Sequence, residues 1–195
     1  MQYKIAFLGS HGSGKTSTIN FIKSRLEEQN KKVSVFTMGW KQFHNPMLNF
    51  FSKIYIKSDY KKNKNDDRLE RFKERSWFFY IIYYIELLTR YFKITRSNAD
   101  FILMDRYFYE ELTFMNGLKY KLFKKITPVP DLVFVLEADA NTIRSRGHFV
   151  SEKKLENFYN KLKILSRDFP MFFIDSSKKY DDIYKKFTNV LKNDN

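Results

Sequence analysis

Residues 9–16 combine three glycines with a closing Lys-Thr pair and match the pattern G-x-x-x-x-G-K-[ST]. Glycines allow a tight loop whose successive backbone N–H groups point inward, and the N-terminus of a following helix adds positive potential. Such a loop binds nucleotide phosphates: we expect Lys15 to reach the β- and γ-phosphates and the Thr16 hydroxyl to bind Mg²⁺. The expected phosphate-binding residues are Gly9, Ser10, His11, Gly12, Ser13, Gly14, Lys15, Thr16 and Ser17.

A second charged group is the pair Asp105 and Arg106, which directly follows the apolar run FILM. A carboxylate at the end of a strand, on the same edge as the glycine loop, can hold Mg²⁺ directly or through water. The adjacent arginine can bind a second phosphate with two parallel hydrogen bonds. The alternative is a surface Asp-Arg pair in a turn. Together with the glycine loop, the pair favours a catalytic site.

A third charged group, Arg144 and Arg146, lies in the segment NTIRSRG. In a mobile lid over about 144–154, these arginines would bring positive charge to a transferring phosphoryl group and stabilise its transition state. One of them could instead cap its helix, with Gly147 as the helix stop. Both remain candidates.

Along the chain, short apolar runs alternate with longer helical patterns. The predicted strands are 3–8, 33–38, 100–105, 131–137 and 171–175. The predicted helices are 16–30, 68–97, 107–114, 140–146, 152–168 and 181–192. The strands are continuously apolar, as strands buried on both faces are. We therefore expect one α/β domain over residues 1–195, a three-layer α/β/α sandwich with a five-stranded parallel sheet. Ligands of such folds bind at the carboxyl ends of the strands.

The composition bears on the kinds of site, the cellular location and the partners that can be expected. The chain has 195 residues, no cysteine and three scattered histidines, so neither a disulfide framework nor a thiolate metal site is expected. The start MQYKIAFLG is too short for a signal peptide, and charges interrupt the apolar segment 77–94, so no membrane span is predicted. A cytoplasmic enzyme is the simplest setting. The net charge of +14 permits anionic partners, including nucleotides, nucleic acid or a peripheral acidic membrane surface. We favour an ordinary solvated surface, and nucleic acid is not the expected partner.

Five segments together carry a family resemblance: GSHGSGKTS, the DRY at 105–107, PDLVFVLEAD, IRSRG and FFIDSS. In this order they resemble the thymidylate kinase family of P-loop nucleoside monophosphate kinases over nearly the whole chain. The resemblance implies ATP with Mg²⁺ as phosphoryl donor, and a homodimer built on a helix such as 77–94. It also implies donor-phosphate roles for Lys15 and Thr16 and an acceptor-phosphate role for Arg106. Arg144 and Arg146 match the family's lid.

The sequence departs from the family around the acceptor. After the second strand it reads TMGWKQFHNP instead of an Arg-Glu-Pro segment, so only Lys41 or His44 could replace that arginine. Phe114 and Met115 stand where the family commonly has a Tyr-Gln pair that helps to position thymine. The lid reads HFVSEKK, without a further arginine. Thymine recognition is therefore left open.

The acceptor chemistry favours a phosphate. A hydroxyl acceptor generally needs a carboxylate base, yet no Asp or Glu occurs between Glu28 and Asp59. A phosphate acceptor is already ionised and needs only positioning and charge. Asp105, Glu110 or Glu111 could still serve as a base for a hydroxyl substrate. Four aromatic residues follow strands and could stack on an acceptor ring, or simply pack: Trp40, Phe43, Tyr107 and Tyr109.

The sequence thus predicts an ATP-dependent kinase, most simply one acting on thymidine monophosphate. Two alternatives stay open: a kinase of the same scaffold that acts on a deoxynucleoside, sugar or lipid-linked head group, and a nucleotide-binding regulator without kinase activity. A GTPase is disfavoured, because NKND at 63–66 follows no apolar strand and no D-x-x-G motif follows DFILMD.

Overall fold

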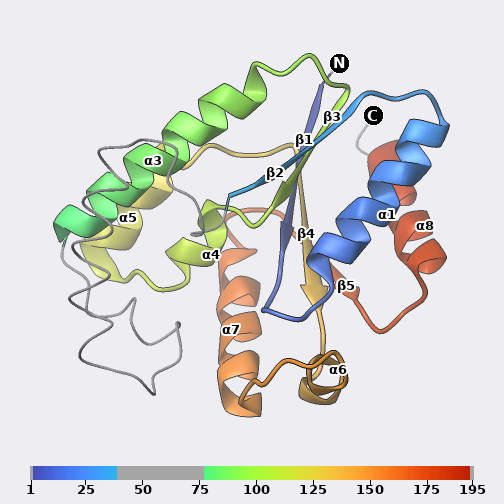
Figure 1. Ribbon diagram of the computed structural model, residues 1–195. Coiled ribbons are helices and arrows are strands. Elements are labelled where there is room, and N and C mark those ends of the chain that lie inside the picture. Colours follow the sequence, from blue (N-terminus) through green and yellow to red (C-terminus); the bar gives the residue numbers. More distant parts are fainter. Residues whose placement is uncertain (1, 39–76, 194–195) are drawn as a thin grey trace.

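The structure, a computed structural model, describes residues 2–38 and 77–193. Five parallel strands form one sheet in the order β2-β3-β1-β4-β5 (Figure 1). The strands are β1 (Tyr3–Leu8), β2 (Val33–Thr37), β3 (Phe101–Asp105), β4 (Leu132–Glu137) and β5 (Phe172–Asp175). Every predicted strand is confirmed to within one residue at each end, and the predicted parallel sheet is confirmed as well.

Seven helices are described in these ranges. They are α1 (Lys15–Glu28), α3 (Trp77–Thr95), α4 (Phe108–Leu112), α5 (Gly117–Ile126), α6 (Ala140–Ser145), α7 (Glu152–Leu165) and α8 (Tyr180–Asn193). Six of them correspond to predicted helices, although residues 68–76 of the predicted helix 68–97 lie outside the described ranges. Helix α5 was not predicted, because it begins with a glycine, carries four lysines and buries only Phe123.

The helices cover both faces of the sheet, which explains its unbroken apolar strands. Along β1, Ile5 and Phe7 pack with α1 and α8, whereas Ala6 and Leu8 face the layer formed by α3, α4 and α7. Figure 1 shows these two layers on opposite sides of the strands. The expected three-layer α/β/α sandwich is therefore the observed fold.

The sheet brings the predicted chemistry together at one edge. Because all five strands are parallel, the segments that follow them lie along the same carboxyl edge. The loop 9–14 follows β1, and Arg106 follows β3. The helix α6 follows β4, and Ser176 follows β5. Residues far apart in the sequence thus meet at the carboxyl edge.

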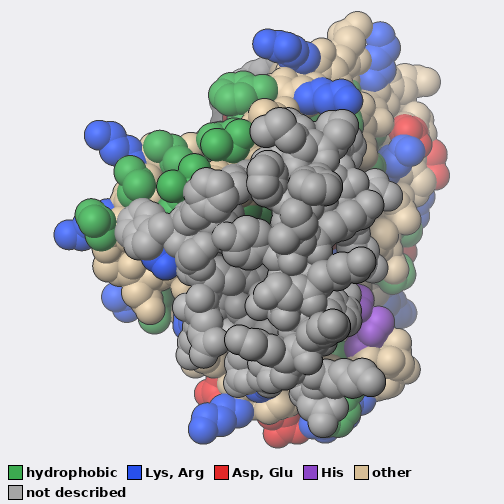
Figure 2. Space-filling view, turned by 60° about the vertical axis from the view of Figure 1, so that its left-hand side comes forward, with side chains coloured by type: hydrophobic (Ala, Val, Ile, Leu, Met, Phe, Trp, Pro, Cys, Tyr) green, Lys and Arg blue, Asp and Glu red, His purple; other side chains and the backbone are tan. Residues whose placement is uncertain are grey.

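Away from this edge, α3 and α5 expose apolar side chains. Ile81, Ile85 and Phe92 are exposed on α3, and Leu118 and Leu122 on α5. Figure 2 shows apolar side chains interspersed with Lys and Arg on this side of the molecule. Within the described residues, no helix combines the length and apolar character that crossing a bilayer requires. The homodimer through this region and the peripheral membrane contact stay predictions.

Candidate active site

The glycine loop joins β1 directly to α1. Gly14 is the N-cap of α1 and has φ +89°, a left-handed conformation that glycine adopts without steric cost. The backbone therefore turns sharply enough for the first N–H groups of α1 to face the loop. The strand, loop and helix required by the phosphate-binding motif are all present in the predicted order.

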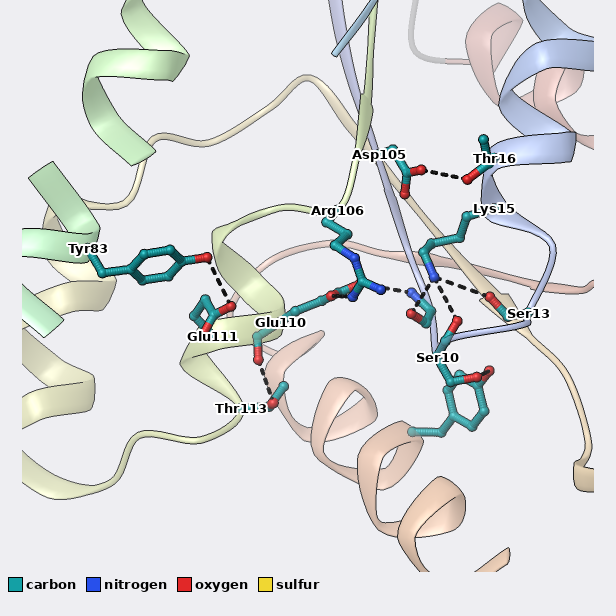
Figure 3. Close-up of polar contacts among 12 residues, drawn as sticks. Ser10, Ser13, Lys15, Thr16, Tyr83, Asp105, Arg106, Glu110, Glu111 and Thr113 are labelled. Atoms are coloured by element: carbon teal, nitrogen blue, oxygen red, sulfur yellow. Dashed lines mark hydrogen bonds and ion pairs between the residues drawn. The ribbon is translucent and has the colours of Figure 1, made fainter. Parts of the chain in front are cut away.

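Lys15 lies inside this loop and is only 6% exposed. Its ammonium group donates hydrogen bonds to the carbonyl oxygens of Gly9 and Ser10, both at 2.7 Å (Figure 3). Burial lowers the pKa of Lys15 from 10.5 to about 8, and the positive charge of Arg106 also lowers it, whereas Glu110 and Asp105 oppose this shift. The fold thus holds a partly desolvated cation where the phosphates of a nucleotide are expected.

Asp105 and Thr16 meet across the two central strands. The ends of β1 and β3 are neighbours, with Phe7 in register with Asp105. The Thr16 hydroxyl donates to Asp105 Oδ2 at 2.8 Å. Among the described residues, no group of three or more metal-ligating side chains occurs, and those residues offer a cation here the Thr16 hydroxyl and the Asp105 carboxylate. Such an oxygen pair suits Mg²⁺, which keeps most of its ligands from water and phosphate.

Hydrogen bonds of both the backbone and the side chain hold Arg106 near Lys15. Its backbone is left-handed, with φ +74°, and its N–H donates to Phe7 O at 2.9 Å. Its guanidinium donates to Glu110 Oε2 at 2.6 Å, and the other oxygen of Glu110 accepts the Gly9 N–H at 3.2 Å. The negative charge of Glu110 is the largest cause of the raised pKa of Arg106. Figure 3 shows Lys15, Arg106 and Glu110 converging beside the loop.

The lid arginines have different surroundings. Arg146 donates to Gly12 O at 3.1 Å and to Ser176 O at 2.8 Å, so it links the glycine loop to the segment after β5. Arg144 instead pairs with Asn141 and Glu152 at the surface, each at 3.2 Å. The structure therefore brings Arg146 to the predicted site and leaves Arg144 beside it.

Histidine rings also join the lid to the loop. His148 packs over Gly12, where a Cβ would lie only 2.7 Å from its ring, so a larger residue would push the lid away. The rings of His11 and His148 are 4.4 Å apart. This contact was not predicted, because a histidine in a polar segment carries no pattern that indicates its partner.

A tyrosine of α7 supports the floor of the loop. Tyr159 donates to Leu136 O at 3.0 Å, accepts the Ala138 N–H at 3.1 Å and lies 3.3 Å from the Ser10 hydroxyl. In the sequence, Tyr159 is one of several apolar-face residues of its helix, so nothing distinguished it. The link ties α7 to the end of β4.

Two of the predicted stacking residues, Tyr107 and Tyr109, are buried, with exposed fractions of 2% and 0%. Tyr107 donates to Pro128 O at 2.9 Å, and the Tyr109 ring stacks on Phe169 at 4.3 Å. These contacts favour the packing role. Pro128 precedes β4 and Phe169 precedes β5, whereas the predicted ligand site lies where the strands end. The other acceptor candidates, Trp40, Lys41, Phe43 and His44, lie outside the described residues.

The candidate bases Glu110 and Glu111 are buried and already engaged. Glu110 is bound by Gly9 and Arg106, and Glu111 accepts the Tyr83 hydroxyl at 3.2 Å. Neither carboxylate is presented to solvent at the carboxyl edge. Asp105, half-buried beside Thr16, is the candidate carboxylate that remains accessible among the described residues.

Comparisons with known proteins agree with this geometry. No family model matches the chain. A curated protein, probable thymidylate kinase 1 of Saccharolobus solfataricus, is 24% identical over 210 aligned residues that cover 98% of both chains. A solved structure, deoxyadenosine kinase from M. mycoides with dCMP and a flexible dCDP bound, superposes with a TM-score of 0.57 at 18% identity and covers 97% of this chain and 99% of its own.

The solved structure shows a likeness of fold, and the curated relative shows a sequence similarity over nearly the full length of the chain. The predicted resemblance to thymidylate kinases is therefore confirmed. The glycine loop, the β2-β3-β1-β4-β5 sheet and the full-length similarity to a probable thymidylate kinase all agree with the scaffold of a P-loop nucleotide kinase.

Proposed function

We propose that this kinase transfers the γ-phosphoryl group of ATP to a nucleoside monophosphate, with thymidine monophosphate as the first candidate. The observation that carries the proposal is the hydrogen bond between Thr16 and Asp105, with Arg106 adjacent. It joins the donor-phosphate loop to the group expected to bind the acceptor. The name of the curated relative supports thymidine monophosphate.

On the donor side, the glycine loop and the start of α1 supply N–H groups to the β- and γ-phosphates. Lys15 exchanges the carbonyl oxygens of Gly9 and Ser10 for phosphate oxygens, whose negative charge favours its protonated form. Thr16 and Asp105 would hold Mg²⁺, which neutralises charge that develops on the phosphates. These groups pre-organise the donor and exclude water from it.

On the acceptor side, the guanidinium of Arg106 holds the acceptor phosphate in line with the donor. An oxygen of the acceptor phosphate forms a bond to the γ-phosphorus, the bond from that phosphorus to the bridging oxygen breaks, and ADP leaves. The acceptor oxygen is already ionised, so no base is needed. The engagement of Glu110 and Glu111 and the lack of acidic residues between Glu28 and Asp59 fit this chemistry.

A hydroxyl acceptor is the second candidate. The deoxyadenosine kinase of M. mycoides shares the fold over nearly the whole chain. Asp105 is the accessible carboxylate that would accept a proton from a deoxynucleoside hydroxyl. The two candidates differ in whether the acceptor already carries a phosphate.

The test is a transfer assay with γ-labelled ATP and Mg²⁺ against nucleoside monophosphates, deoxynucleosides and sugars. We expect label in thymidine diphosphate, lost by at least about 1,000-fold in Lys15→Ala and Asp105→Ala because each removes transition-state charge stabilisation. Lys23→Ala and Asp182→Ala make the same changes at exposed positions on α1 and α8 and should retain transfer. Label in deoxynucleosides alone would establish the hydroxyl acceptor. Bound ATP with no labelled product would refute both candidates.

A further inference from the structure

We propose that Glu110 is a positioning residue that fixes the acceptor-binding Arg106 relative to the first peptide of the phosphate loop. The inference deepens the proposed function and rests on it. In this arrangement, the carboxylate of Glu110 sets the distance and orientation between the donor and acceptor phosphates. It does so without contacting either substrate.

One carboxylate oxygen of Glu110 binds the donor-phosphate loop, and the other binds the arginine proposed to hold the acceptor phosphate. Oε1 accepts the Gly9 N–H at 3.2 Å, and Oε2 accepts from the Arg106 guanidinium at 2.6 Å. Glu110 is 6% exposed, so water competes little for either bond. A buried charge-assisted hydrogen bond of this length is among the stronger contacts a protein makes. One rigid group thus spans both halves (Figure 3).

The backbone reinforces this frame. Gly9 follows β1 directly, and the Arg106 N–H donates to Phe7 O two residues earlier on the same strand. The left-handed φ of +74° at Arg106 directs its side chain back toward α4, where Glu110 lies one turn along. The backbones of Arg106 and Gly9 are therefore both attached at the end of β1, and the Glu110 carboxylate binds both residues.

Arg106 needs such a partner in order to act as a selective clamp. Its side chain is 36% exposed, and a long flexible arginine loses conformational entropy whenever it is held in one orientation. Glu110 binds Nη1 of the guanidinium. The planar group is thereby oriented in advance, and its remaining N–H donors stay available for a phosphate.

The charges favour the same role. Glu110 lies near two cations, Lys15 and Arg106, which act on each other at short range. The carboxylate offsets their repulsion, so both cations can remain close enough to act on two adjoining phosphates. Since both oxygens are already occupied by donors, Glu110 is poorly placed to take a proton from a substrate.

The decisive variant is Glu110→Gln. A glutamine has one acceptor oxygen and one NH₂ group, so it can keep either the Gly9 or the Arg106 hydrogen bond, and its NH₂ faces the other donor. We expect kcat/KM for thymidine monophosphate to fall about 10- to 100-fold, chiefly through KM. Glu110→Asp, which keeps the charge, should recover part of this loss. Glu27→Gln changes the net charge equally at an exposed site of α1 and should match the wild type.

A double-mutant cycle with Arg106→Ala separates positioning from general damage. If Glu110 acts through Arg106, Glu110→Gln in the Arg106→Ala background should change the KM for thymidine monophosphate by less than about twofold. An equal fold-loss in both backgrounds, or an unchanged KM in the single variant, would overturn the inference. If Glu110→Gln fails to fold, the same cycle is measured with Glu110→Asp.

The inference and the proposed function can fail separately. If the wild type transfers no label to any acceptor, the proposed function fails, and Glu110 is then examined in the protein alone by NMR. Glu110→Gln should speed hydrogen exchange of the Gly9 amide and shift the guanidinium signal of Arg106. If neither changes, Glu110 does not hold these two groups.

Discussion

The phosphate loop after β1 and the predicted lid over residues 144–154 both carry cations, but the surroundings of these cations differ. Lys15 is buried and bound by carbonyl oxygens of its own loop. The Arg144 side chain is 43% exposed and pairs with Glu152, which is more exposed still. Buried charges interact strongly, whereas exposed pairs are screened by water and salt. The fold therefore fixes the charge of the loop, and the lid contributes charge only through a side chain that is brought inward.

Arg146 is the residue of the predicted lid that contacts the phosphate loop, so it gives the largest effect expected within the lid. Arg146→Ala removes the contacts to Gly12 and Ser176 and a positive charge beside the phosphate loop. We expect kcat to fall about 100-fold, as when one donor to a developing negative charge is removed. The measurement is steady-state transfer with saturating ATP, with circular dichroism to confirm folding. A loss below about threefold would mean that the loop carries the catalytic charge alone.

Lys15 is expected to affect the free energy of unfolding as well as phosphoryl transfer. The unfolded pKa is near 10.5 and the folded pKa about 8, so the folded state bears a penalty for the charged form that is fully present below pH 8. Lys15→Met should stabilise the protein by about 2–3 kcal/mol at pH 7 while abolishing transfer. Because the penalty is relieved as pH rises from 8 toward 10.5, this advantage should shrink at pH 10.

Urea unfolding of the wild type and of Lys15→Met at pH 7 and pH 10 measures this difference directly. The comparison between variants cancels groups that titrate in both. A destabilised Lys15→Met at pH 7 would show that the hydrogen bonds to Gly9 and Ser10 outweigh the cost of burial.

Arg144 gives the smallest expected effect. Its partners Asn141 and Glu152 lie at the surface, and exposed ion pairs contribute from nothing to about 1 kcal/mol. Arg144→Ala should therefore change kcat by less than about threefold. A loss as large as that of Arg146→Ala, measured in the same assay, would indicate that the lid turns Arg144 inward during the reaction.

Much of the fold could be predicted from the sequence because strands buried on both faces leave continuous apolar runs. The glycine loop encodes its own backbone, and parallel strands bring Asp105 to Thr16 without further information. The local sequence pattern was enough to predict the structure wherever a single loop or strand determines the backbone geometry. Helix α5 was missed since its exposed face carries both leucines and lysines.

The rest of the site depends on backbone conformations and side-chain orientations that the sequence pattern does not predict. The pairing of Arg106 with Glu110 follows from a left-handed backbone at a residue that is not glycine. Tyr107 and Tyr109 follow a strand, as stacking residues would, but both side chains are buried in the core at the start of α4. The acceptor candidates in TMGWKQFHNP lie outside the described residues.

The hydroxyl of Tyr159 has a mechanical consequence. By bonding to Leu136 and Ala138, it anchors α7 to the end of β4, so we expect α7 to stay with the sheet if the predicted lid moves. Such a motion would then take place in the short span between α6 and α7. Gly147 lies in that span with φ +78° and no atoms crowding the position of a Cβ. A lid built in this way would turn about Gly147 on a fixed base, and the length of that span would set its reach.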